Sequence, residues 1–168
     1  MGLVRMDIQT LAVGAGPVPS LIVLRNRPAE GKAAVQLPIR IGPVEAAAIS
    51  MGLDDTPRAR PLTHDLLQNT ITSLGAMLEG VAIVDVQGTT FFAQLFLLDE
   101  LGRRLNVDCR PSDGIALAVR MDAPIYADDH VIEAASVPNF QGVERDEKDR
   151  ELERFHDFVE SLSPEDFA

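Results

Sequence analysis

Two stretches of the chain share one pattern that decides the fold: Leu37–Ala46 reads LPIRIGPVEA, and Leu105–Gly114 reads LNVDCRPSDG. In both, apolar residues alternate with other residues, a proline follows, and an acidic residue stands two positions after that proline. Alternation is typical of a strand, and proline suits the first position of a helix. The copies are offset by 68 residues (105 minus 37). We therefore expect two β-hairpin–helix units that pack as a pseudo-symmetric pair, because neither can bury its apolar face alone.

The sequence around these stretches supplies the remaining elements. β-branched runs and Gly/Pro turns predict strands over 4–13, 21–24, 33–41, 81–86, 91–98, 103–109 and 123–126. Proline starts and helical spacing predict helices over 43–52, 63–75, 111–119 and 128–134. Thr63 is the expected N-cap of the second helix, whose buried stripe is predicted to be Leu66, Leu67, Ile71 and Leu74. The expected fold class is α+β, with duplicated β-hairpin–helix units forming a mixed, partly closed sheet flanked by helices, plus a C-terminal helix.

The chain divides by composition into a body and an acidic tail. We expect one domain over 1–137, a linker over 138–143 and an amphipathic helix over 144–168. That last segment holds ten acidic and four basic residues, so it carries −6 of the net charge of −11 and leaves −5 for the body. Its apolar residues Leu152, Phe155, Val159 and Leu162 form a narrow seam, which predicts docking on the body or on a partner.

Composition excludes several classes of protein. The 168 residues include 26 acidic and 15 basic side chains, and the basic surface that most nucleic-acid-binding domains use is therefore not expected. The single cysteine, Cys109, cannot form an internal disulfide, and no zinc-ligand spacing occurs. No apolar run reaches the roughly eighteen residues of a membrane span, and the N-terminus lacks the features of a secretory signal. We expect a cytoplasmic protein with no membrane contact.

A first candidate site lies in Arg60–Asp65, which reads RPLTHD. His64 beside Asp65 at a helix start suits a general acid or base, or a pair of metal ligands. The alternative is local and structural, because an acid in the first turn stabilises a helix by about 0.3–1 kcal/mol through the helix dipole.

A second candidate site lies in Asp108–Asp113, which reads DCRPSD. Carboxylates are the ligands that Mg²⁺ and Mn²⁺ prefer, and Arg110 can bind a phosphate through two N–H groups. Glu45 matches Asp113 in the repeat, so both acids converge on one cleft if the two units face each other. The alternative is local and structural: Asp113 stands at the third helical position, which favours an acid, and Arg110 pairs with Asp108 or Asp113.

Three segments of the chain, taken in order, resemble motifs of the bifunctional nuclease family, and the resemblance covers roughly residues 1–137. The motifs are Leu37–Ala46, then RPLTHDLL over Arg60–Leu67, then VDCRPSDGIALA over Val107–Ala118. The resemblance implies a compact α+β domain that hydrolyses both RNA and DNA. A nuclease with a net charge of −11 needs a divalent metal, a short substrate or a local basic cleft, for which Arg58, Arg60, Arg110 and Arg120 are candidates.

Two functional hypotheses follow. In the first, the protein is a phosphodiesterase acting on RNA and DNA with Mg²⁺ or Mn²⁺: His64, Asp65 and Asp113 are catalytic, Arg60 and Arg110 bind substrate, and Glu45, Asp65, Asp108 and Asp113 bind metal. In the second, the protein is a non-catalytic regulatory or oligomeric interaction module whose motifs are caps and ion pairs. In both cases we expect a homo-oligomer.

Overall fold

A computed structural model gives the fold, and it describes residues 2–14, 18–28, 34–54 and 59–138. Residues Met1–Val137 belong to one compact unit. Most of the predicted linker, the whole predicted helix over 144–168 and Arg58 lie outside the described residues. Within the described residues, no helix combines the length and apolarity needed to cross a lipid bilayer.

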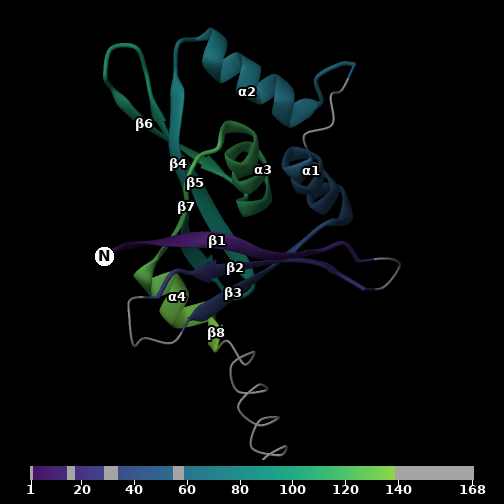
Figure 1. The fold of residues 1–168 in the computed structure, drawn as a ribbon. Coiled ribbons are helices and arrows are strands. Elements are labelled where there is room, and N and C mark those ends of the chain that lie inside the picture. Colours follow the sequence, from purple (N-terminus) through teal and green to yellow (C-terminus); the bar gives the residue numbers. More distant parts are fainter. Residues whose placement is uncertain (1, 15–17, 29–33, 55–58, 139–168) are drawn as a thin grey trace, which may run out of the picture. The chain divides into compact units, whose positions relative to one another are not determined.

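Each half of the domain is a three-stranded antiparallel meander that runs into a helix (Figure 1). The first half consists of β1 (Leu3–Ala12), β2 (Ser20–Asn26), β3 (Val35–Ile41) and α1 (Pro43–Leu53). The second consists of β4 (Met77–Gln87), β5 (Thr90–Leu98), β6 (Arg104–Cys109) and α3 (Pro111–Met121). A single residue joins strand to helix in each half, Gly42 in the first and Arg110 in the second, and proline begins both helices. The predicted duplication is confirmed. Each unit contains three strands, whereas the predicted hairpin has two.

The strand β7 (Ile125–Asp128) lies between the two halves of one mixed, open sheet, whose order is β6-β5-β4-β7-β1-β2-β3-β8. β1 pairs with β7 in antiparallel fashion, with Met6 opposite Ile125, and β4 pairs with it in parallel, with Val81 opposite the same residue. β1 and β4 therefore run in opposite directions, as a pseudo-twofold axis along the sheet normal requires. The short β8 (Val137–Pro138) follows β3 at the other edge.

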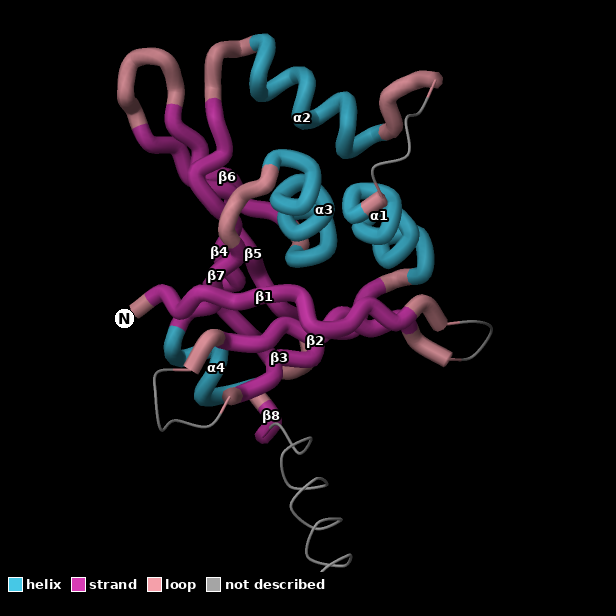
Figure 2. Tube along the Cα trace, viewed as in Figure 1, coloured by secondary structure: helices cyan, strands magenta, loops and turns pink. Residues whose placement is uncertain are grey.

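Within the part of the chain that the structure describes, four helices cover this sheet (Figure 2). α1 contacts β1, β2 and α3, whereas α3 contacts β4 and β5. α2 (Thr63–Ser73) touches α3 and β4, and α4 (Asp129–Ala135) touches β3, β4 and β7. The predicted α+β class is confirmed.

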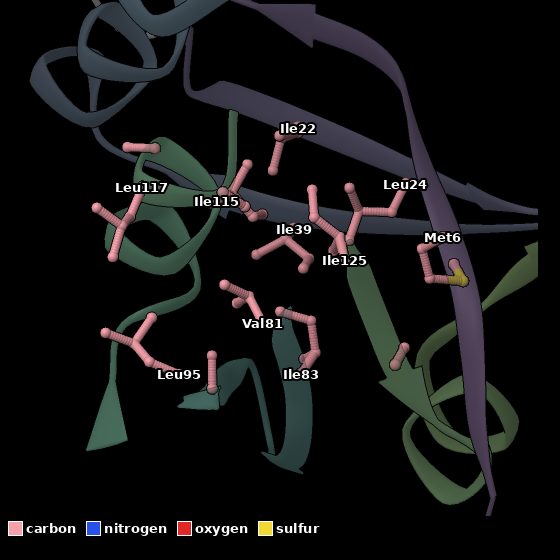
Figure 3. Packing of buried hydrophobic residues seen from close by; sticks show 14 of the residues in the cluster. Met6, Ile22, Leu24, Ile39, Val81, Ile83, Leu95, Ile115, Leu117 and Ile125 are labelled. Atoms are coloured by element: carbon pink, nitrogen blue, oxygen red, sulfur yellow. The ribbon is translucent and has the colours of Figure 1, made fainter. Parts of the chain in front are cut away.

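One hydrophobic core joins the strands of both halves to α3 (Figure 3). Ile115 and Leu117 of α3 are fully buried together with Val81 and Ile83 of β4 and Ile22 of β2. Truncating such a side chain to alanine costs about 2–5 kcal/mol. α3 also lies very close to the sheet: a Cβ at Gly114 would meet Val81 Cγ1 at 2.7 Å and Cys109 Sγ at 3.1 Å. That close approach is a physical reason for glycine inside this helix.

Two predictions about α2 are wrong. Leu62 is the N-cap residue rather than Thr63, and its backbone N–H donates to the Asp65 carboxylate at 2.8 Å. Of the predicted buried stripe only Ile71 is buried, whereas the exposed members are Leu66, Leu67 and Leu74. The reason is that α2 lies at the periphery of the fold, where its main contacts are with α3 and β4.

Candidate functional site

Arg110 links the two repeats through their equivalent acids. Its NH1 group donates to Glu45 Oε1 at 2.9 Å, and its Nε and NH2 groups donate to Asp113 at 2.6 and 3.2 Å. Both acids stand at the third position of a helix that begins with proline, and α1 and α3 pack together. The predicted convergence of Glu45 and Asp113 is therefore present, with a guanidinium between them.

His64 extends this cluster from α2. Its Nε2 lies 3.1 Å from Asp113 Oδ1, and the side chains of His64 and Asp113 are 16% and 31% exposed. An ionised carboxylate only accepts hydrogen bonds, so a neutral His64 must carry its proton on Nε2 and its lone pair on Nδ1. His64, Asp113, Arg110 and Glu45 form one connected set, named here the His64–Arg110 cluster.

The charges in this cluster stabilise one another. Burial by itself raises the pKa of Asp113, but hydrogen bonds from Arg110 and His64 outweigh it and hold that pKa below its usual value. The two carboxylates likewise hold the pKa of Arg110 above its usual value, with Asp113 the stronger influence. Asp113 therefore stays ionised at neutral pH, ready to hold the imidazole in one orientation.

Asp65 lies outside this cluster. Its carboxylate pairs with Arg120 Nε at 2.6 Å, and the Arg120 side chain is only 4% exposed. The NH1 group of Arg120 donates to the backbone carbonyls of Ala48 and Ala116, so this buried arginine ties α1, α2 and α3 together. Because its side chain is buried, Arg120 is not available to line a basic cleft. The catalytic and metal-binding roles of Asp65 stay predictions of the sequence.

Asp108 and Arg60 are also separate from the cluster in their contacts. Asp108 is an exposed residue of β6, next to the partly buried Cys109. Strand alternation places Asp108 on the opposite face from Cys109, which packs against the core. Burial raises the pKa of the Cys109 thiol to about 11, and the negative charges of Asp113 and Asp108 contribute to this shift. Arg60 is an exposed residue in the bend before α2.

The metal prediction can be tested against the donor set of the described residues. No three His, Cys, Asp or Glu side chains among them converge closely enough to hold a metal ion. Glu45 and Asp113 both face the Arg110 guanidinium, which lies where a cation shared by these carboxylates would sit. This arrangement does not fit a divalent ion, and binding of Mg²⁺ or Mn²⁺ stays a prediction of the sequence.

A cavity of about 290 Å³ opens beside the cluster. Arg110 and Glu45 line it together with residues that the sequence reasoning missed: Arg40, Thr90, Phe91 and Ser112. The repeat gave a usable signal for Arg40, which occupies the position equivalent to Asp108 (40 plus 68). The two equivalent positions therefore carry opposite charges, so the halves differ in charge at this place.

Comparison with known proteins gives consistent matches. The family model described as "Bifunctional nuclease domain" matches residues 22–139. Two relatives from Mycobacterium tuberculosis, the "Uncharacterized protein MT1877" of strain CDC 1551 / Oshkosh and the "Uncharacterized protein Rv1829" of strain ATCC 25618 / H37Rv, are each 41% identical over 135 residues. Those residues cover 78% of this chain and 80% of each relative.

Proposed function

Because the chain belongs to the bifunctional nuclease domain family, we propose that it hydrolyses phosphodiester bonds of RNA and DNA with His64, Asp113 and Arg110. The observation that carries the proposal is the contact between His64 and Asp113, two residues from separate motifs that are 49 positions apart. A histidine oriented by a carboxylate is a common arrangement for proton transfer in hydrolysis.

His64 is the general base of the proposed reaction. Asp113 accepts a hydrogen bond from Nε2–H, so the lone pair on Nδ1 is the one that takes a proton from water. The water oxygen then bonds to phosphorus, the bond to the leaving sugar oxygen breaks, that oxygen takes up a proton from solvent, and the His64 imidazolium releases its proton to solvent. Asp113 also stabilises the imidazolium that forms, so it acts as a positioning residue for His64.

Arg110 is the phosphate-binding residue. A guanidinium has five N–H groups, and hydrogen bonds to Glu45 and Asp113 use three of them. The side chain is 64% exposed, so the remaining N–H groups can reach a non-bridging phosphate oxygen. Glu45 and Asp113 fix the orientation of this fork before substrate binds, which avoids an entropic cost at the moment of reaction.

The acidic charge of the chain favours short or single-stranded substrates over long duplexes. Long-range repulsion grows with the number of phosphates near the surface, and a flexible strand can present one phosphate to Arg110 while holding the others away. No step of the proposed reaction passes through a metal ion, since the donor set does not form a ligand sphere.

The test is cleavage of fluorescently labelled single-stranded RNA and DNA by the full chain. We expect wild-type protein to cut both, also after treatment with EDTA, and His64→Ala to lose activity by at least 100-fold. Asp7→Asn is the matched control, because it disrupts the Asp7–Arg27 ion pair, which lies outside the cluster. Cleavage that EDTA abolishes and Mg²⁺ or Mn²⁺ restores would instead support the sequence-based metal prediction, with a cation displacing Arg110.

A second candidate function, an oligomeric interaction module, is favoured by the exposed edge strand β6. All of Arg104–Asp108 is exposed, with Leu105 and Val107 at 46% and 42%. A second copy pairing antiparallel about Asn106 would set Leu105 opposite Val107, and Arg104 opposite Asp108 of the other copy. This match of charge and apolarity supports a second copy of this chain as the partner.

A further inference from the structure

The cavity beside Arg110 is separate from the His64–Asp113 pair. It is formed where the end of β3, the start of α1, the β4–β5 turn and the start of α3 meet. Arg110 belongs both to the cavity and to the His64–Arg110 cluster, whereas His64 and Asp113 do not line the cavity. A ligand in this cavity would therefore lie next to the proposed reaction centre rather than on it.

Ser112 offers an unused hydroxyl to this cavity. The residue is only 6% exposed, and its hydroxyl has no hydrogen-bond partner among the described residues. Among the described residues, Gln9 Oε1 is the only side-chain polar atom that is fully buried and lacks a hydrogen-bond partner. The Ser112 hydroxyl therefore reaches open space, and the space that Ser112 lines is this cavity. A buried polar group without a protein partner costs free energy unless a ligand or water binds it.

Arg40 adds a positive charge at the same place. It is an exposed residue of β3, and its side chain forms no ion pair with the described part of the chain. Counting the lining side chains, two guanidinium groups face the cavity and Glu45 supplies the one carboxylate. Because Glu45 is already paired with Arg110, the unpaired charge of Arg40 makes the cavity suitable for an anion.

We propose that this cavity binds one nucleotide unit of a nucleic acid strand. Arg40 and the free N–H groups of Arg110 donate to its phosphate oxygens, and the Ser112 hydroxyl donates to the same group. Phe91 forms an apolar wall for the base or sugar. The volume of about 290 Å³ lies near the lower end of ligand pockets, at about 300–1,000 Å³, which suits a single nucleotide.

This inference rests on the proposed function for its choice of ligand, but it concerns binding and needs no hydrolysis. The adjacent unit of the same strand would extend from Arg110 toward His64. Arg40 and Ser112 would then set how the strand is positioned, which makes them substrate-positioning residues of the reaction.

The test is isothermal titration calorimetry of the full chain with thymidine 5′-monophosphate, thymidine and inorganic phosphate as probes. We expect thymidine 5′-monophosphate to bind at least tenfold more tightly than either of the other two. Arg40→Ala and Ser112→Ala should weaken its binding by at least tenfold and threefold, and circular dichroism should show both variants folded. Arg103→Ala is the matched control, because it removes an equal charge from the exposed Arg103–Asp99 pair of the β5–β6 turn.

The outcomes separate this inference from the proposed function. Binding of thymidine 5′-monophosphate that Arg40→Ala and Ser112→Ala leave unchanged overturns the nucleotide site, whatever the cleavage assay gives. Equal affinity for inorganic phosphate also overturns it. Binding that depends on Arg40 and Ser112 and survives His64→Ala supports it, even if the wild-type protein cuts nothing, a result that would count against the nuclease proposal alone.

Discussion

Glu45 and Asp113 are equivalent residues of the two repeats, and they share the guanidinium of Arg110. The pseudo-symmetry brings the acids together, but only the second repeat supplies an arginine, because Gly42 occupies the position equivalent to Arg110. The site is thus asymmetric although the scaffold is duplicated. The two carboxylates also differ in their other contacts, since Asp113 binds His64 and Glu45 does not.

Gly42→Ala should disturb the cluster without disturbing the fold. A Cβ at Gly42 would lie 2.1 Å from Glu45 Oε2, so the Glu45 carboxylate has to move away from Arg110. The backbone there has φ of −77°, which alanine adopts freely, and we expect stability within about 1 kcal/mol of wild type. Cleavage should fall both in Gly42→Ala and in Glu45→Gln, and the two effects should not add, because both variants weaken the same contact between Glu45 and Arg110. Additive losses in the cleavage assay would contradict this explanation.

Arg120 should be a stability residue. Replacing it with methionine leaves Asp65 and the carbonyls of Ala48 and Ala116 without their partner in a largely buried place. We expect a loss of about 3 kcal/mol in the free energy of unfolding, measured by urea denaturation. Arg103→Ala, at an exposed ion pair, should cost no more than about 1 kcal/mol. Equal losses in the two variants would show that the Arg120 contacts are not structural.

His130 should make stability depend on pH. A hydrogen bond to Asp128 raises the pKa of His130, and a second contact, to Asp85, adds to this. The contribution of His130 to stability is present below its ordinary pKa of 6.5 and is lost as the pH rises through the higher folded value. The pKa values of Asp85 and Asp128 are lowered, so their contribution is present above the ordinary value of 3.8 and is lost as the pH falls through the folded values.

The melting temperatures of wild type and His130→Ala should therefore differ most between pH 3.8 and 6.5 and converge on either side. Thermal denaturation across pH 3–9 measures this difference. A constant difference at all pH values would mean that the histidine contributes through packing and not through charge.

The β6 edge should mediate self-association if the protein is an interaction module. We expect a dimer by light scattering coupled to size exclusion, and dissociation in Arg104→Asp, which sets two acidic residues opposite each other across the interface. Asp108→Arg should act in the same way, and the double charge exchange should restore the dimer. A monomeric wild type, or charge reversals without effect, would remove β6 as the interface.

The repeat made much of the scaffold predictable. Alternation, proline and the acid after it are local features, so the strands, the starts of α1 and α3 and the positions of Glu45 and Asp113 followed from the sequence. The exposure of α2 did not, because an amphipathic pattern marks an apolar face and says nothing about whether another element covers it. Leu66 and Leu74 are exposed for that reason.

The contacts of the candidate site were less predictable. Asp65 and Asp113 look alike in sequence, since each is the third residue of a helix. Their partners lie 55 and 49 residues away, and only the packing of α2 against α3 decides that Asp65 meets Arg120 and Asp113 meets His64. Arg40 and Ser112 were missed because a cavity between four chain segments has no linear pattern.

Single-turnover cleavage of a labelled single-stranded oligonucleotide by wild type, His64→Gln, Asp113→Asn and the double variant decides whether the His64–Arg110 cluster is an active centre. We expect each single variant to be slower by about 10²–10⁴-fold and the double variant to be no slower than the slower single one, because the two residues act as a unit. Wild-type rates in either folded single variant would contradict catalysis by this pair and leave the ion-pair network as a purely structural feature.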